Sequence, residues 1–198
     1  SEAAQASQDA GLPVLAVLPF SAVTATADSA FFAAGVHDDL LTRLAQLPSM
    51  LVISRTSVLE YRDTQQNIRE IGAALGADAI LEGGVQRSGD QVRINLQLIE
   101  AESDAHLWAQ TYTRELSAKN VFVIQAEIAE AVADVLQAIL TDDERGQLEK
   151  LPTNNLQALD AYFLGNQYYN QATSEGYSKA IVAYQTAVEL DPRFSSAY

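Results

Sequence analysis

The sequence predicts an α/β fold: a three-layer domain with a mixed β-sheet of about five strands, followed by an all-α helical hairpin. A continuous apolar run at 14–18 is typical of a parallel strand buried on both faces. Alternating apolar and polar residues over 79–112 predict an antiparallel meander. Small and aromatic residues recur at helical spacing after residue 155. With 198 residues, 48% of them hydrophobic, the chain suits one medium domain plus an appendage.

The chain begins with a predicted β-α-β unit. Residues 14–18 form its first strand and 51–53 its second. Between them, apolar residues at helical spacing predict an amphipathic helix: Phe32, Val36, Leu40, Leu44 and Leu47. Asp28 or Ser29 is the expected N-cap of this helix. The order strand, helix, strand implies a parallel pair joined by a right-handed crossover.

A second helix and a third strand follow. The apolar positions of 68–75 mark the helix, which Gly76 closes as its C′ residue. The strand covers 79–86 and contains Gly83 and Gly84. We interpret this glycine pair as a bulge or as a close approach of another backbone.

The register of the meander follows from its first turn. If Gly89 and Asp90 form a two-residue turn, Val85 lies opposite Ile94. A loop one residue longer would place a polar neighbour opposite Val85, and a sheet with one buried face resists that shift.

A four-residue loop at 101–104 would similarly place Leu98 opposite Leu107. The sheet then has an apolar face made of Val85, Ile94, Leu96, Leu98, Leu107 and Ala109. Its other face carries Glu82, Gln86, Arg93, Asn95, Gln97, His106, Trp108, Gln110 and Tyr112. A long amphipathic helix is expected to cover the apolar face with Ile124, Ile128, Val132, Val135 and Ile139.

These elements divide the chain into four segments: a flexible leader at 1–11, the α/β domain at 12–140, an acidic linker or short helix at 141–154, and the hairpin at 155–198. Asn155 and Thr173 are expected to cap the two helices of the hairpin. Pro192 ends the second of these helices.

The hairpin resembles one tetratricopeptide repeat (TPR). The resemblance rests on Leu164, Gly165, Tyr168, Ala180, Tyr184, Ala187 and Pro192. A single repeat cannot bury its apolar face alone, so we expect the start of a longer array of about three or more repeats. The resemblance assigns a partner-binding groove to Tyr162, Asn166, Tyr169 and Asn170. Tyr162 replaces a Lys that clamps C-terminal carboxylates in some repeats, so such a ligand is not expected.

The α/β domain resembles a second bacterial family. Four strings occur in this family's order, at 17–20, 53–57, 81–90 and 106–109. They are similar to the family related to the amino-terminal domain of the Tol translocation protein TolB. The resemblance implies an α/β sandwich between a membrane helix and a TPR array, with a nucleotide cyclase or winged-helix DNA-binding domain upstream. We therefore expect the periplasmic part of a membrane-anchored regulator, with a cytoplasmic location as the alternative.

Composition narrows the class of partner. The net charge of -14 and the pI near 4.3 disfavour nucleic acid and anionic membrane surfaces, because phosphates require Lys and Arg. The chain has no cysteine, which excludes disulfides and thiol chemistry. No apolar run approaches the roughly 20 residues that span a bilayer, so no direct membrane insertion of this segment is expected.

Neither histidine belongs to a recognisable catalytic or metal-binding pattern. His37 precedes two acids, but no second histidine lies within ligand spacing, and we expect it on a helix surface. No nucleophile motif accompanies His106. The sequence therefore predicts no enzyme activity, no metal and no cofactor.

The leading functional hypothesis is a non-enzymatic interaction module that binds a protein or peptide partner. The alternative is a small-ligand sensor on the polar face of the sheet, with Arg93, Gln97, His106, Trp108 and Tyr112 as candidate contacts. That face could instead pack against the hairpin. Homo-oligomerisation also stays open.

Overall fold

A computed structural model describes residues 11–23 and 27–197. The predicted leader lies, except for its last residue, outside these described residues. The elements are, in order, β1 (Val14–Val17), β2 (Ser21–Ala22), α2 (Ala27–Ala45), β3 (Leu51–Val52), α3 (Arg55–Leu59), α4 (Ile68–Leu75), β4 (Ala79–Ser88), β5 (Gln91–Glu100), β6 (Ala105–Glu115), α5 (Ala118–Val135), α6 (Asp142–Leu148), α7 (Leu156–Tyr169), α8 (Ser174–Leu190) and the 3₁₀ turn η1 (Ser195–Ala197).

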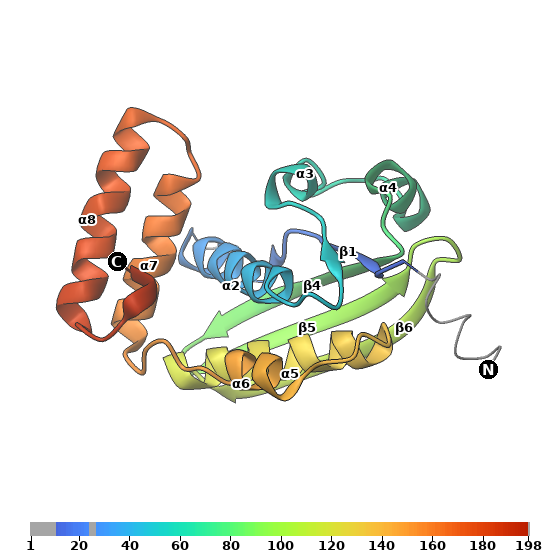
Figure 1. The fold of residues 1–198 in the computed structure, drawn as a ribbon. Coiled ribbons are helices and arrows are strands. Elements are labelled where there is room, and N and C mark those ends of the chain that lie inside the picture. Colours follow the sequence, from blue (N-terminus) through green and yellow to red (C-terminus); the bar gives the residue numbers. More distant parts are fainter. Residues whose placement is uncertain (1–10, 24–26, 198) are drawn as a thin grey trace.

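One mixed sheet organises the α/β part, as predicted (Figure 1). Its strand order is β3-β1-β4-β5-β6, and the short strand β2, which the sequence did not predict, pairs with β4. β1 runs parallel to both β3 and β4, whereas β4, β5 and β6 form an antiparallel meander. The parallel β-α-β unit is therefore confirmed.

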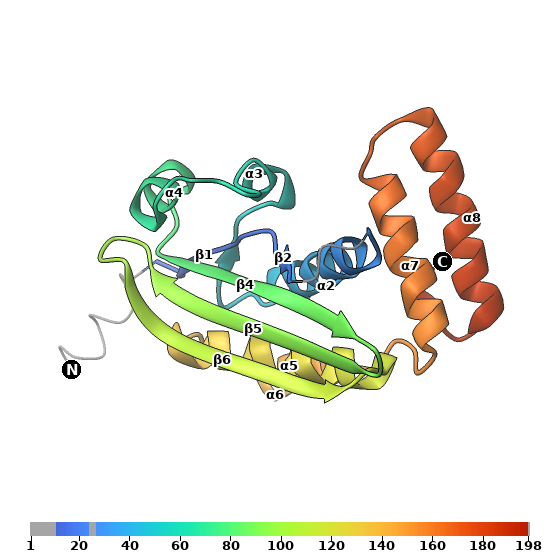
Figure 2. The same cartoon turned by 180° about the vertical axis from the view of Figure 1, so that it is seen from behind.

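Two helices cover one face of the sheet. α2 and α5 lie behind the strands in Figure 2, while α3 and α4 lie toward the edge of the sheet that β3 forms beside β1. The core between sheet and helices contains Leu15, Phe32, Val36, Leu98 and Ile128, all with 0% exposure. The continuous apolar run of β1 and the apolar positions that recur at helical spacing in α2 both supply side chains to this core.

The first turn of the meander has the predicted register. Val85 lies opposite Ile94, and the pairing of β4 with β5 runs without interruption. The glycine pair therefore marks a close approach rather than a bulge: a Cβ on Gly83 would lie 2.2 Å from the carbonyl oxygen of Asn95.

The second register prediction was wrong. Glu100 pairs with Ala105 across the expected loop, but a register shift follows between Leu98 and Ile99. Leu98 consequently lies opposite Trp108 instead of Leu107, and the rest of β6 turns its side chains to the other face.

Several predicted helix ends also need correction. α2 already includes Ala27, so Asp28 and Ser29 lie inside the helix and neither is its N-cap. Ile139 lies beyond the end of α5 and is 87% exposed, so it does not cover the sheet. α4 ends at Gly76 as predicted, with φ of 64° in the left-handed region.

The C-terminal part contains a two-helix hairpin, α7 and α8. The side chains of Asn155 and Thr173 cap these helices as predicted. Gly165 allows a close approach, since a Cβ there would lie 2.3 Å from the ring of Tyr184. The acidic segment before the hairpin contains α6, which begins with a capping box at Thr141. Within the described residues, no helix is long and apolar enough to cross a membrane.

Candidate functional site

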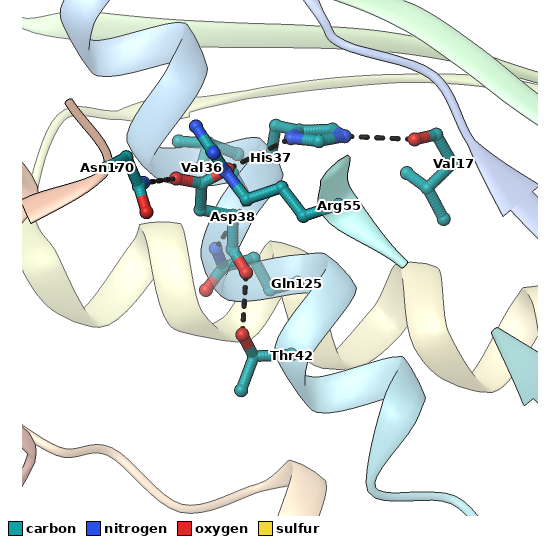
Figure 3. Close-up of polar contacts among 8 residues, drawn as sticks. All are labelled: Val17, Val36, His37, Asp38, Thr42, Arg55, Gln125 and Asn170. Atoms are coloured by element: carbon teal, nitrogen blue, oxygen red, sulfur yellow. Dashed lines mark hydrogen bonds and ion pairs between the residues drawn. The ribbon is translucent and has the colours of Figure 1, made fainter. Parts of the chain in front are cut away.

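A polar cluster lies where the hairpin meets the α/β domain (Figure 3). Its centre is the carboxylate of Asp38 on α2. Oδ1 accepts hydrogen bonds from Arg55 Nε at 2.6 Å and His37 Nδ1 at 3.2 Å, and Oδ2 accepts one from Asn170 Nδ2 at 2.9 Å. The cluster thus joins α2 to α3 and to the end of α7, across 132 residues of sequence.

The environment of Asp38 favours its charged form. Burial by itself would raise the pKa of this carboxyl, but the hydrogen bonds from His37 and Arg55 outweigh burial and lower it below the ordinary value of 3.8. Asp38 therefore keeps an anionic charge beneath the hairpin.

His37 is a core residue and not the surface histidine that we predicted, because only 1% of it is exposed. Its Nε2 lies 2.9 Å from the carbonyl oxygen of Val17, at the end of β1. Both ring nitrogens therefore face acceptors, and both hydrogen bonds can form only when both nitrogens carry protons. The ring also contacts Phe20 edge to face at 5.3 Å.

A second buried pair follows on the next residue of α2. Arg43 Nε donates to Asp39 Oδ2 at 2.9 Å, and its Nη1 donates to the carbonyl of Leu148 at 3.1 Å. Burial raises the pKa of Asp39, against the opposing effect of the Arg43 charge. Arg43 also lies 5.0 Å from the centre of the Phe122 ring, so one guanidinium connects α2, α5 and the end of α6.

The hairpin is fixed to the α/β domain at two further points. Arg87, near the end of β4, makes a two-pronged ion pair with Asp160 on α7 at 2.8 and 3.1 Å. Phe163 packs on Phe32 with 5.8 Å between ring centres, and it closes over Gly35. These contacts turn one side of α7 toward α2 and the α/β domain, so the opposite side of α7 faces away from that domain.

The four predicted groove residues have different surroundings. The rings of Tyr162 and Phe194 are 5.0 Å apart, so Tyr162 is partly buried. Asn166 accepts a hydrogen bond from the Tyr184 hydroxyl at 2.7 Å. Asn170 binds Asp38. Tyr169 is 58% exposed and is the exposed one of the two tyrosines in this set.

Tyr169 belongs to an exposed apolar patch that the sequence analysis did not identify. Its ring lies 5.5 Å from that of Tyr177 on α8, which is 44% exposed, and Ile181 follows one turn later at 57% exposure. We call Tyr169, Tyr177 and Ile181 the hairpin patch. The spacing of four between Tyr177 and Ile181 was the signal available in the sequence.

The five residues predicted to share a polar sheet face do not do so. Tyr112 is 7% exposed and Trp108 packs partly buried against the core, on the covered face with Leu98. Arg93 and Gln97 alternate to the opposite face. The cause is the register shift before Trp108, which reverses the remainder of β6 relative to the expectation.

His106, the remaining member of that set, precedes the shift. It pairs with Ile99 on β5 and is exposed. The predicted face therefore keeps Arg93, Gln97 and His106 but loses both of its aromatic side chains.

Comparisons with solved structures give remote similarities. TolB from Acinetobacter baumannii is 15% identical, with a TM-score of 0.49 over 67% of this chain and 30% of that chain. The PelC dodecamer from Paraburkholderia phytofirmans is 20% identical, with a TM-score of 0.42 over 66% of this chain and 90% of that chain.

Sequence comparison gives a closer relationship. A protein of Rhizobium meliloti (strain 1021) named "Putative adenylate cyclase 3" is 30% identical over 186 residues, which are 94% of this chain and 31% of that protein. The chain thus spans about a third of this relative's length. The family model described as HilA/YgeH-like transcriptional regulator, second domain, matches residues 11–131. This chain therefore belongs to the HilA/YgeH-like transcriptional regulator family and contains that family's second domain.

Proposed function

We propose that this chain is a non-enzymatic interaction module of a bacterial regulatory protein and that its hairpin patch binds a helical segment of a protein partner. The observation that carries the proposal is the patch itself. Tyr169, Tyr177 and Ile181 are 58%, 44% and 57% exposed and come from two neighbouring helices. Adjacent exposed apolar side chains of this size are typical of protein-binding surfaces.

The attachment of the hairpin supports this role. Phe163 and the pair Arg87–Asp160 hold the opposite side of α7 against the α/β domain. A partner bound at the patch would therefore meet a surface that is already ordered, which reduces the entropy lost on binding.

We further propose that the hairpin is a TPR unit and that its partner helix comes from a further repeat or a similar amphipathic segment. A helical pair with one apolar side open can bury that side only against another helix. In this arrangement, Tyr169 alone of the four predicted groove residues makes a large contact with the partner.

The regulatory setting is supported by the family and by the cyclase-named relative. Since the chain covers only 31% of that relative, we propose that it acts beside a separate effector domain in a longer protein.

We place the module on the periplasmic side of a membrane-anchored parent protein. These 198 residues contain no cysteine, so Lys119→Cys in a parent protein whose remaining cysteines are replaced provides one labelling site, which should react with a membrane-impermeant maleimide in intact spheroplasts. Labelling only after lysis would place it in the cytoplasm.

Site-specific photocrosslinking tests the hairpin patch. A photoreactive amino acid at Ile181 of the full-length parent should give one dominant adduct in cells, identified by mass spectrometry as a helical segment. The same group at Thr186, an exposed position on another side of α8, is the matched control. Equal adduct yields at the two positions would refute the assignment of the patch.

A substitution separates binding from stability. Tyr169→Ala should lower the yield of the Ile181 adduct. The free energy of unfolding should stay within about 0.5 kcal/mol of the value for the unsubstituted chain, because the Tyr169 side chain is mostly exposed. A large loss of stability would instead identify Tyr169 as a packing residue.

A further inference from the structure

Two adjoining cavities run along α2, and no residue of the hairpin patch lines either of them. One, of about 430 Å³, lies between α2, α3 and α7, and the other, of about 580 Å³, extends toward β2, β4 and β5. They share Ala30, Ala34 and Arg62 in their linings. The small side chains of α2 leave room between the helices, and each cavity has the size of an ordinary small-molecule site.

The cavity beside α7 is basic. Arg55 and Asp38 both line it, but they form an ion pair with each other at 2.6 Å, which leaves the charge of Arg62 uncompensated in this lining. Arg62, which borders both cavities, is exposed and makes no ion pair with any residue that the structure describes. In a chain with a net charge of -14, an unpaired arginine next to a second arginine is a local exception. A planar guanidinium of this kind matches a carboxylate through two parallel hydrogen bonds.

Side-chain amides complete that end of the site. Gln167 and Gln171 of the hairpin line the same cavity as Arg62. Their amide groups can donate to a carboxylate oxygen and accept from a neighbouring hydroxyl or amine. The ligand would thus touch both the α/β domain and the hairpin.

The cavity beside the sheet has the opposite charge. Asp63 and Glu82 line it, and neither carboxylate has a cationic partner among the residues at 11–23 and 27–197. Thr64 and Gln97 add hydrogen-bonding groups. An ammonium group would be the complementary occupant of this end.

We propose that the two cavities form one binding site for a small zwitterion, an amino-acid-like molecule that carries a carboxylate at one end and an ammonium group at the other. Its carboxylate binds Arg62 and the hairpin amides, and its ammonium group binds Asp63 and Glu82. Because α3 and α7 contribute to the same site, the bound ligand stabilises the packing of the hairpin against the α/β domain.

Calorimetric titration of the 198-residue chain with 4-aminobutyrate tests the proposal, with butyrate and butylamine as probes that each carry one of the two charges. We expect saturable binding of 4-aminobutyrate at least about tenfold tighter than either comparator, as two charge contacts instead of one imply. Equal binding of the three probes, or no saturable heat with 4-aminobutyrate, would overturn the proposal.

Variants assign the two ends of the site. Arg62→Gln should weaken 4-aminobutyrate binding at least about tenfold. Arg145→Gln makes the same charge change at an exposed site on α6, outside both cavity linings, and should leave binding unchanged. Equal affinity of the two variants would exclude Arg62 as the carboxylate-binding residue.

The double variant Asp63→Asn, Glu82→Gln should remove the preference for 4-aminobutyrate over butyrate while leaving butyrate binding intact. Asparagine suits position 63, where φ is +56° in the left-handed region. If the double variant keeps the preference, the ammonium group does not bind where we propose.

Discussion

Phe163 of the hairpin lies directly on Gly35 of α2, so closely that a Cβ at Gly35 would stand 2.3 Å from the Phe163 Cγ. Gly35→Ala should therefore destabilise the chain by about 1–2 kcal/mol, since the cost of overpacking exceeds the helix propensity that Ala adds. Urea unfolding measures the change. In the matched variant Gly146→Ala on α6, a Cβ meets nothing within 4 Å, so stability should rise by about 0.5–1 kcal/mol. A Gly35→Ala protein as stable as the parent chain would contradict the close packing of α7 on α2.

Asp38→Asn should cost about 1–3 kcal/mol at neutral pH, because Arg55 and His37 lose a charged acceptor at a mostly buried position. The pKa of Asp38 lies below its ordinary 3.8, so its contribution to stability is complete above 3.8 and is lost as the pH falls through the lowered folded pKa. Unfolding measured from neutral to strongly acidic pH should thus show a shallower acid loss in Asp38→Asn. Asp134→Asn, at an exposed position on α5, is the control. Parallel acid curves for Asp38→Asn and the parent chain would show that Asp38 contributes nothing in this range.

The register shift in β6 predicts opposite outcomes for two neighbouring side chains. Trp108→Ala should cost about 2–3 kcal/mol because this indole packs against the core. Leu107→Ala should change stability by no more than about 0.5 kcal/mol because Leu107 is 42% exposed. Thermal or urea unfolding of the two variants distinguishes the registers. If Leu107→Ala lowered the stability more than Trp108→Ala, the result would support the pairing of Leu98 with Leu107 instead.

The hydroxyl of Tyr184 gives the hairpin a dependence on alkaline pH. Burial raises the pKa of Tyr184 from 10.0 to about 12. The unfolded chain therefore ionises first, and the contribution of this group is complete below pH 10.0 and is lost as the pH rises through about 12. Tyr184→Phe should unfold less steeply with pH in that window and should lose about 0.5–1.5 kcal/mol at neutral pH with the bond to Asn166. Tyr177→Phe, at an exposed position of the same helix, is the matched control.

Features that depend on near neighbours in sequence were predictable. The two-residue turn at Gly89 sets the pairing of Val85 with Ile94, and Asn155 and Thr173 cap their own helices. Caps and turns depend on a few residues that are close in sequence, so they can be predicted without knowledge of the fold. The same reasoning failed at Leu107, because one bulged residue reverses every side chain that follows it.

The candidate site was predictable only in its outline. Of the predicted groove residues, Tyr169 is 58% exposed, whereas Asn170 is bonded to Asp38. The burial of His37 and the ion pair of Arg87 with Asp160 had no local signal. Both depend on how α2 packs against the sheet and how α7 packs against α2.

The sequence by itself determined the order of the longer strands and helices, but not the short elements β2 and α3. It also determined the parallel β-α-β unit, the first turn of the meander and the two-helix hairpin. Each follows from apolar periodicity, caps and turn residues within short windows. Only the tertiary structure decided which polar residues meet: Asp38 with Asn170, 132 positions away, and Arg87 with Asp160, 73 positions away. The physical reason is that such contacts form only after packing of the apolar faces brings distant segments together, and that packing depends on the shapes of all the elements at once.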